Sequence, residues 1–275
     1  MEVDDAGTGT LPFLIHGRGA IPGGEVIVDA SRSSQFVSAL LLSAARFDAG
    51  ATIRHVGPAV PSTPHIDMTV RMLSSHGVQV RQTADAPVVG HSRFTWHVDP
   101  QEIRAHDWTI EPDLSNALPF IAAAIVTSGR MHVRDWPQES FQPATDVLEV
   151  LRAFGARVMQ DSGGLIVEGP SESEGISGID VDLSAIGETA PTMAAIAVFA
   201  RSASTLRGIG HIRGHETDRL AALETEITRL GGSISQTSDG LRIEPSTLRA
   251  GTFHTYDDHR MATTAAIIGL SLIHI

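Results

Sequence analysis

One short segment of the sequence gathers side chains that could move a proton and bind an anion. His215, Glu216 and Arg219 lie within five residues, and the apolar spacing that follows predicts that they stand at the start of a helix. Residues three or four apart are neighbours on a helix, so both His215 and Glu216 are expected beside Arg219. Such a group could transfer a proton and hold a phosphate or carboxylate. The structural alternative is an exposed Glu–Arg pair worth under about 1 kcal/mol.

Three further segments place polar residues before apolar helices. Helix starts offer free backbone N–H groups to anions, which hydroxyl, amide and guanidinium groups could supplement. The alternative is helix capping, which by itself better explains the serine segment and the glutamate. The residues are Ser33, Ser34, Gln35, Glu188, His259 and Arg260.

A metal site is not expected. His211 and His215 have the spacing of a helical ligand pair, but Gly214 interrupts the helix and no third ligand follows. The chain has no cysteine, which excludes disulfides, cysteine-ligated metals and a thiol nucleophile.

A repeated block of strands and helices predicts how these residues are positioned. Four segments share a short strand, a Ser or Asp turn and a small-residue helix. The strand and the beginning of its turn are expected at 26–31, 108–111, 179–184 and 254–258. The first three continue with a strand, a loop, a second helix and two short strands, and Gly77, Gly155 and Gly231 are expected to end the second helices. The block β-α-β-α-β-β recurs roughly every 70 to 85 residues, and the fold class is α/β.

The repeat predicts that the polar segments converge. Parallel strands joined by right-handed crossovers bring the strand-to-helix turns to one side of a sheet. Each block has two such turns, and the polar segments described above lie at them. We therefore expect anion-binding groups to gather at these edges.

Composition limits the possible partners. A net charge of −12 disfavours nucleic acid or an anionic membrane as the main partner. The acidic N-terminus lacks the features of a signal peptide, and no apolar run is long enough to span a membrane, so a cytoplasmic protein is expected. The sequence stops inside the first helix of the fourth block, and the strand-like residues 11–15 have no preceding block to complete. Both features predict a fragment truncated at both ends.

Taken together and in order, four motifs resemble one family. They are Ser33-Ser34-Gln35, Ser62-Thr63-Pro64-His65, Arg213-Gly214-His215-Glu216-Thr217-Asp218-Arg219-Leu220 and Asp258-His259-Arg260-Met261. Over nearly the whole chain the sequence resembles the 5-enolpyruvylshikimate-3-phosphate synthases. His215, where many members carry Lys, is similar to the actinobacterial version.

The resemblance implies an enolpyruvyl transferase fold with two domains, each built from β-α-β-α-β-β blocks as an inside-out α/β barrel, closing over a cleft. Residues 1–107 would form about half of the N-terminal domain. Residues 108–275 would form the second domain without its C-terminal end.

The resemblance also implies the site. Shikimate 3-phosphate would be held by Ser33, Ser34, Gln35 and Ser62, and His215 would contact it or the intermediate. Glu188 would take the proton of the attacking 5-hydroxyl. Glu216 would protonate the phosphoenolpyruvate methylene. Phosphoenolpyruvate itself would be clamped by Arg219, His259 and Arg260.

The implied activity is transfer of the enolpyruvyl group of phosphoenolpyruvate to the 5-hydroxyl of shikimate 3-phosphate, with release of phosphate, in chorismate and aromatic amino acid biosynthesis. Two carboxylates in opposite protonation states suffice for the proton transfers to the tetrahedral intermediate. No metal or organic cofactor is expected. A monomer is expected, and glyphosate-type inhibitors could bind.

The sequence lacks some of the family's motifs. The N-terminal Lys-Ser and Arg motifs and the C-terminal Lys segment have no match. We therefore expect the isolated chain to turn over at least about a thousandfold more slowly than a full-length relative.

Two other readings stay open. One is a UDP-N-acetylglucosamine enolpyruvyl transferase, although its usual active-site cysteine is absent and the third motif favours the shikimate enzyme. The other is a non-catalytic remnant that binds ligand without turnover.

Overall fold

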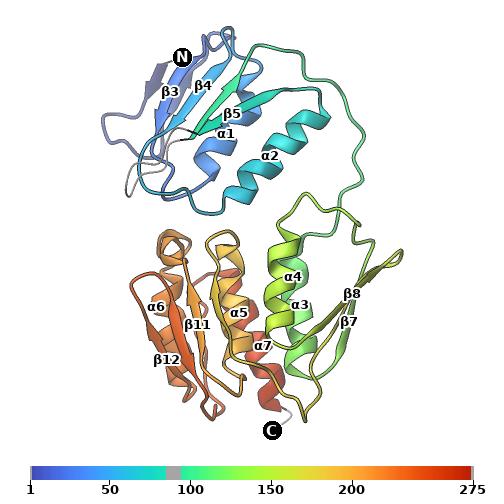
Figure 1. Cartoon of the computed structure of the whole chain (residues 1–275). Helices are drawn as coiled ribbons and strands as arrows, with labels where there is room; N and C mark the ends of the chain where they lie inside the picture. Colours follow the sequence, from blue (N-terminus) through green and yellow to red (C-terminus); the bar gives the residue numbers. More distant parts are fainter. Residues whose placement is uncertain (1, 85–93, 274–275) are drawn as a thin grey trace. The chain divides into compact units, whose positions relative to one another are not determined.

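The computed structural model describes residues 2–84 and 94–273, which form two compact units, Met1–Trp108 and Thr109–Ile275 (Figure 1). Each unit has its own apolar core. We call them unit 1 and unit 2.

Unit 1 contains a four-stranded sheet with two helices. The strands follow the order β3-β4-β6-β5, in which β3 and β4 are parallel and the other pairs are antiparallel. A small antiparallel pair, β1 and β2, precedes them. The elements are β1 (Glu2–Asp4), β2 (Leu14–His16), β3 (Gly24–Val28), α1 (Gln35–Ala44), β4 (Ala51–His55), α2 (Thr63–Ser75), β5 (Val80–Ala84) and β6 (Phe94–Val98).

The core of unit 1 explains its local structure. Helix α1 buries Val37, Leu41 and Ala44, which recur at helical spacing, and α2 buries Ile66 and Leu73 in the same way. Strand β4 buries every second residue, as expected of a strand with one covered face. The two helices pack on each other and on this face.

Unit 2 contains two sheets. One has the order β10-β11-β13-β12, with β10 and β11 parallel and the other pairs antiparallel. The other has three antiparallel strands in the order β7-β9-β8. The strands are β7 (Arg130–Arg134), β8 (Arg157–Asp161), β9 (Gly164–Glu168), β10 (Asp180–Asp182), β11 (Ser204–Arg207), β12 (Ser233–Gln236) and β13 (Leu241–Glu244).

Three of the helices form the interior of unit 2. Helices α3, α5 and α7 pack on one another, and Figure 1 shows the two sheets on either side of them. Helix α5 is buried along its whole length, which explains its small apolar residues. The helices are α3 (Leu114–Val126), α4 (Ala144–Ala153), α5 (Ala190–Ala197), α6 (Arg219–Arg229) and α7 (His259–Ile273), with short 3-10 turns η1 (Gly187–Thr189) and η2 (Gly210–Gly214).

The topology confirms the α/β class and the predicted repeat. The four strands of the first and third blocks take the same spatial order, first-second-fourth-third, and the three strands of the second block keep this order without a first strand. The glycines predicted to end the second helices have the positive φ angles that this position requires, 79° at Gly77, 101° at Gly155 and 88° at Gly231.

Two predicted strands were wrong. Residues 108–111 make no ladder with any strand in the described ranges, because the chain passes there from unit 1 to unit 2. Residues 254–258 form a turn in which Tyr256 and Asp257 both have a φ of 56°, a left-handed conformation that a strand does not allow.

None of the helices in the described part of the chain combines the length and the apolar character needed to cross a bilayer.

Candidate functional site

In unit 1, the predicted anion-binding residues lie at one edge of the sheet. Because β3 and β4 are parallel neighbours, the helices that follow them, α1 and α2, both begin at the carboxyl end of the strands. Ser34 and Ser62 are the N-cap residues of these helices, and Gln35 is the first residue of α1. The structure therefore places the first and second motifs at the same sheet edge.

The hydroxyl groups of this edge are only partly used by the fold. Ser33 Oγ accepts a hydrogen bond from the backbone N–H of Gln35 at 3.2 Å. The side chains of Ser34 and Ser62 make no capping hydrogen bond, although both residues are buried. Ser62 also has a φ of 50°, a left-handed conformation that is unfavourable for a residue with a Cβ atom.

A buried histidine holds the two turns of this edge together. His55, at the end of β4, accepts a hydrogen bond at Nδ1 from the backbone N–H of Ala30 at 3.2 Å. Its Nε2 lies 2.8 Å from the carbonyl oxygen of Pro58, so Nε2 carries the proton and donates it. His55 thereby joins the turn before α1 to the turn before α2.

In unit 2, Arg219 is the centre of the candidate site. Its side chain is fully buried at the start of α6, and its guanidinium meets three carboxylates. Nη2 donates to Glu216 Oε2 at 2.6 Å, and Nη1 lies 3.5 Å from Glu188 Oε2. Nε and Nη2 both donate to Asp258, at 2.8 and 3.3 Å. The predicted neighbourhood of Glu216 and Arg219 is confirmed.

Asp258 is the buried counter-ion of Arg219. Its side chain is inaccessible to solvent, and its Oδ1 also accepts a hydrogen bond from the backbone N–H of Arg260 at 2.8 Å. Burial opposes ionisation of this carboxyl, but the hydrogen bonds from Arg219 and from the start of α7 outweigh it and keep its pKa below the ordinary value. Asp258 therefore ties the start of α7 to the start of α6.

Glu188 lies among three nitrogen-bearing side chains. Besides Arg219, its carboxylate lies 3.7 Å from His215 Nδ1 and 3.8 Å from Arg260 Nη2. Its side chain is about one-third exposed, so a ligand can reach it. Strands β10 and β11 are parallel, which brings the turn that carries Glu188 and the turn that carries His215 to one sheet edge.

Arg260 has unused hydrogen-bonding capacity. Nη1 donates to the carbonyl oxygen of Ser115, at the start of α3, at 3.1 Å. Its Nε–H is buried and has no partner among the described residues. Buried polar groups in folded proteins are rarely left unpaired, so this donor is available to a bound anion.

Two histidines flank Glu188. The rings of His211 and His215 are 5.9 Å apart in an edge-to-face arrangement, and His211 Nε2 is buried without a partner in the described structure. Burial lowers the pKa of both imidazoles, and the Glu188 carboxylate only partly opposes this. His215 Nδ1 lies 2.9 Å from Arg219 Nη1 and must accept that hydrogen bond, so His215 is neutral in this geometry.

Not every predicted residue joins this network. His259 is the first residue of α7, its side chain is exposed, and no hydrogen bond or ion pair is found for it within the described ranges. Arg219 is held by three carboxylates and by His215, so direct contact with phosphoenolpyruvate would require one of them to move.

Sequence reasoning missed two residues of the site. Asp258 is identified from the sequence only as part of the fourth motif, because nothing in its local sequence shows a partner 39 positions away. His211 was considered only as a metal ligand. The sequence feature that could have identified His211 is its position in the turn after the second strand of the third block.

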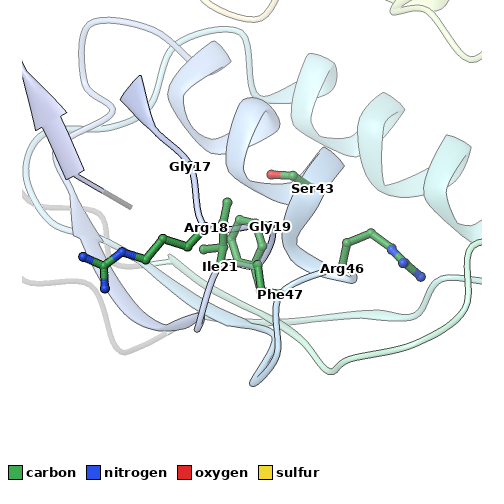
Figure 2. Close-up of a pocket in the computed structure, with 8 residues that line it drawn as sticks. Gly17, Arg18, Gly19, Ile21, Ser43, Arg46 and Phe47 are labelled. Atoms are coloured by element: carbon green, nitrogen blue, oxygen red, sulfur yellow. The ribbon is translucent and has the colours of Figure 1, made fainter. Parts of the chain in front are cut away.

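A surface pocket in unit 1 lies away from these residues. It has a volume of about 360 Å³ and sits beside the C-terminal end of α1, whereas Ser34 and Gln35 are at the N-terminal end. Figure 2 shows that Arg18 and Arg46 point away from each other, so they do not form a joint anion site. The lining residues are Gly17, Arg18, Gly19, Ala20, Ile21, Ser43, Arg46 and Phe47.

Comparison with known proteins agrees with these motifs. A family model described as EPSP synthase (3-phosphoshikimate 1-carboxyvinyltransferase) matches residues 2–274. The 3-phosphoshikimate 1-carboxyvinyltransferase of Kocuria rhizophila is 50% identical over 271 residues, which are 98% of this chain and 58% of that protein. The chain thus spans somewhat over half the length of this curated relative.

Solved structures share the fold. The EPSP synthase of Acinetobacter baumannii matches with a TM-score of 0.73 at 22% identity, over 98% of this chain and 61% of that one. The enolpyruvyl transferase NikO of Streptomyces tendae matches with a TM-score of 0.60 at 16% identity, over 92% and 58%. These likenesses confirm the predicted enolpyruvyl transferase fold. The family model, which matches nearly the whole chain, shows that the chain belongs to the EPSP synthase family.

Proposed function

We propose that the protein containing this chain transfers the enolpyruvyl group of phosphoenolpyruvate to the 5-hydroxyl of shikimate 3-phosphate and releases phosphate. The observation that carries the proposal is the network of Glu188, Glu216, Arg219 and Arg260, in a chain half identical to a 3-phosphoshikimate 1-carboxyvinyltransferase. We further propose that the protein is a monomer in the cytoplasm, that glyphosate-type inhibitors can bind it, and that it needs no cofactor.

The phosphate of shikimate 3-phosphate is assigned to the serine edge of unit 1. Ser34 and Ser62 have hydroxyls that cap no helix, and the free N–H groups of α1 and α2 would add to them. Ser33 and Gln35 complete the set. Hydroxyl and backbone donors at two helix starts suit a phosphate monoester.

The two proton transfers are assigned to two carboxylates of unit 2. Glu188 is the base for the 5-hydroxyl, because its carboxylate is accessible and the guanidinium of Arg260 beside it can stabilise negative charge there. Glu216, in its protonated form, delivers its carboxyl proton to the methylene carbon and becomes the carboxylate that pairs with Arg219. Its side chain is about half exposed and is oriented by the hydrogen bond from Arg219.

Phosphoenolpyruvate is assigned to Arg260, with Arg219 and His259. The buried Arg260 Nε–H without a partner would bind an anionic oxygen. This Nε–H donor would also stabilise the negative charge that develops as the tetrahedral intermediate loses phosphate. His215 would contact the shikimate ring or the intermediate as a neutral imidazole.

Binding calorimetry tests the substrate assignment directly. The chain is expected to bind shikimate 3-phosphate more tightly than UDP-N-acetylglucosamine. Ser34→Ala should weaken the binding of shikimate 3-phosphate by about tenfold, since one hydrogen bond to a charged group is worth about 1.5–3 kcal/mol. Ser43→Ala, on the same helix but at its other end, is the matched control. Tighter binding of the nucleotide sugar would overturn the substrate assignment.

Phosphate release tests the catalytic assignment. Glu188→Gln and Glu216→Gln should each reduce turnover by about a hundredfold or more, as expected for loss of a general acid or base. The control is Glu244→Gln, which changes an exposed carboxylate paired with Arg242 on β13. Unchanged turnover in either site variant would refute that residue's role.

A further inference from the structure

A second buried carboxylate of unit 2, Glu226 on helix α6, takes no part in the chemistry proposed above. The side chain of Glu226 is inaccessible to solvent. It accepts hydrogen bonds from the backbone N–H of His254 at 2.9 Å and from the Tyr256 hydroxyl at 2.7 Å. Arg229, one turn further along α6, donates to the same carboxylate, from Nε to Oε2 at 3.1 Å and from Nη2 to Oε1 at 3.3 Å. Burial of an unpaired carboxylate is costly, so these donors are what allow Glu226 to be buried.

The donors of Glu226 belong to the segment that enters helix α7. Residues 245–258 contain no strand or helix. In the part of the chain that the structure describes, the hydrogen bonds that join residues 250–257 to α6 are those made with Glu226. Glu226 therefore makes the hydrogen bonds that attach this segment to the helix, while Phe253 packs against the core of unit 2.

The attached segment contains an unfavourable turn. Tyr256 and Asp257 follow each other with a φ of 56° each, and a residue with a Cβ atom adopts this conformation only when its surroundings hold it there. The hydroxyl of Tyr256 ends on Glu226, although its ring is partly exposed. The buried carboxylate is the contact that compensates this turn.

The turn leads directly into the candidate site. The next residue is Asp258, which binds Arg219 through both carboxylate oxygens. Arg219 and Glu226 are seven positions apart on the buried face of α6, two helical turns and about 10 Å along the axis. The same helix thus holds the segment at two points, Glu226 before the turn and Arg219 after it.

We propose that Glu226 is a positioning residue for the site: by holding His254 and Tyr256, it maintains the left-handed turn that brings the Asp258 carboxylate to Arg219. Its role in catalysis rests on the proposed function, since Glu226 reaches the site only through Tyr256, Asp258 and Arg219. Its effect on the geometry of Arg219 does not depend on any activity.

The first test uses the chain's single tyrosine. The hydrogen bond to Glu226, together with burial, raises the pKa of Tyr256 above its ordinary value. In Glu226→Gln the carboxylate is replaced by a neutral amide of the same shape, so the tyrosinate absorbance should titrate at lower pH than in the parent. Glu224→Gln is the matched control, because Glu224 lies on the same helix but binds Gln236 of β12.

The second test observes Arg219 itself. The Nε–H of Arg219 is buried and donates to Asp258 at 2.8 Å, so it should give a slowly exchanging nitrogen–proton NMR signal, assigned by its loss in Arg219→Lys. In Glu226→Gln and in Tyr256→Phe, this signal should shift and exchange about tenfold faster or more. In Glu224→Gln it should keep the parent's position and exchange rate.

The outcomes distinguish three cases: Glu226 positions Arg219, any change on α6 loosens the structure, or the proposed function is wrong. An Arg219 signal unchanged in both Glu226→Gln and Tyr256→Phe would overturn the proposal, and so would an equal change in Glu224→Gln. Calorimetry with phosphoenolpyruvate and shikimate 3-phosphate on the same variants gives the functional readout. If the parent binds neither ligand, the proposed function fails, whereas the Arg219 signal still decides the role of Glu226.

Discussion

Removing either partner of the Arg219–Asp258 pair should destabilise unit 2, and the two changes should differ in cost. Arg219→Met keeps the length of the side chain without its charge, and Asp258→Asn keeps an oxygen that can accept from the backbone N–H of Arg260. Both side chains are almost completely buried. Loss of one partner from a buried ion pair costs about 3–5 kcal/mol.

The local charge decides which change is worse. After Asp258→Asn, Arg219 keeps Glu216 at 2.6 Å and Glu188 at 3.5 Å, so the cost should be near 3 kcal/mol, the lower end of the range. After Arg219→Met, all three carboxylates remain, with only the more distant Arg260 to balance them. The cost should then be near the upper end, about 5 kcal/mol.

Hydrogen exchange of unit 2 amides, followed by mass spectrometry across a denaturant series, measures these costs. This readout is needed because a chain with two units need not unfold in one transition. The double variant should cost less than the sum of the single changes by about 2–3 kcal/mol, since the two groups are in contact. Equal costs for the single variants, or strict additivity in the double variant, would refute this account of the charge balance.

Three further predictions follow from other parts of the structure. First, His211 and His215 both have pKa values lowered below the ordinary 6.5, so the unfolded chain binds more protons than the folded one below about pH 6.5. The free energy of unfolding that these residues contribute should be fully present above that pH. It should fall as the pH drops toward the folded pKa values, by at most about 1.4 kcal/mol per pH unit for each histidine. Unfolding curves recorded over a pH series measure this dependence, and His215→Gln should make it less steep. Second, Ser62→Gly removes a Cβ atom from a left-handed residue and should stabilise unit 1 by up to about 1 kcal/mol, as measured by denaturant unfolding, while calorimetry should show weaker binding of shikimate 3-phosphate. Unchanged binding would contradict the assignment of Ser62 to the phosphate, and a loss of stability would contradict the account of its backbone. Third, a Cβ atom at Gly187 would lie 2.4 Å from His211 Nε2, so Gly187→Ala should displace that ring and cost about 1–3 kcal/mol, visible as a lower melting temperature and a shifted His211 signal in NMR spectra.

Most of the fold could be predicted from local patterns. The four apolar helices that open the blocks, the strands that follow them and the glycines that end α2, α4 and α6 depend on residue spacing over a few positions, where propensity and capping act directly. The repeat then implied that the turns share a sheet edge, since parallel neighbours leave little choice of topology.

The amino-acid sequence by itself determined the repeated block, the glycines that end the second helices and the neighbourhood of Glu216 and Arg219, because each depends on contacts within one or two helical turns. Only the tertiary structure decided that Arg219 is buried against Asp258, that residues 108–111 pair with no strand, and that Tyr256 and Asp257 turn left-handed beneath Glu226. Each of these depends on a partner about 30 or more positions away, or on the chain's passage between units. A local pattern contains no information about such a partner, because the free energy of a buried ion pair arises only once the surrounding core has excluded water.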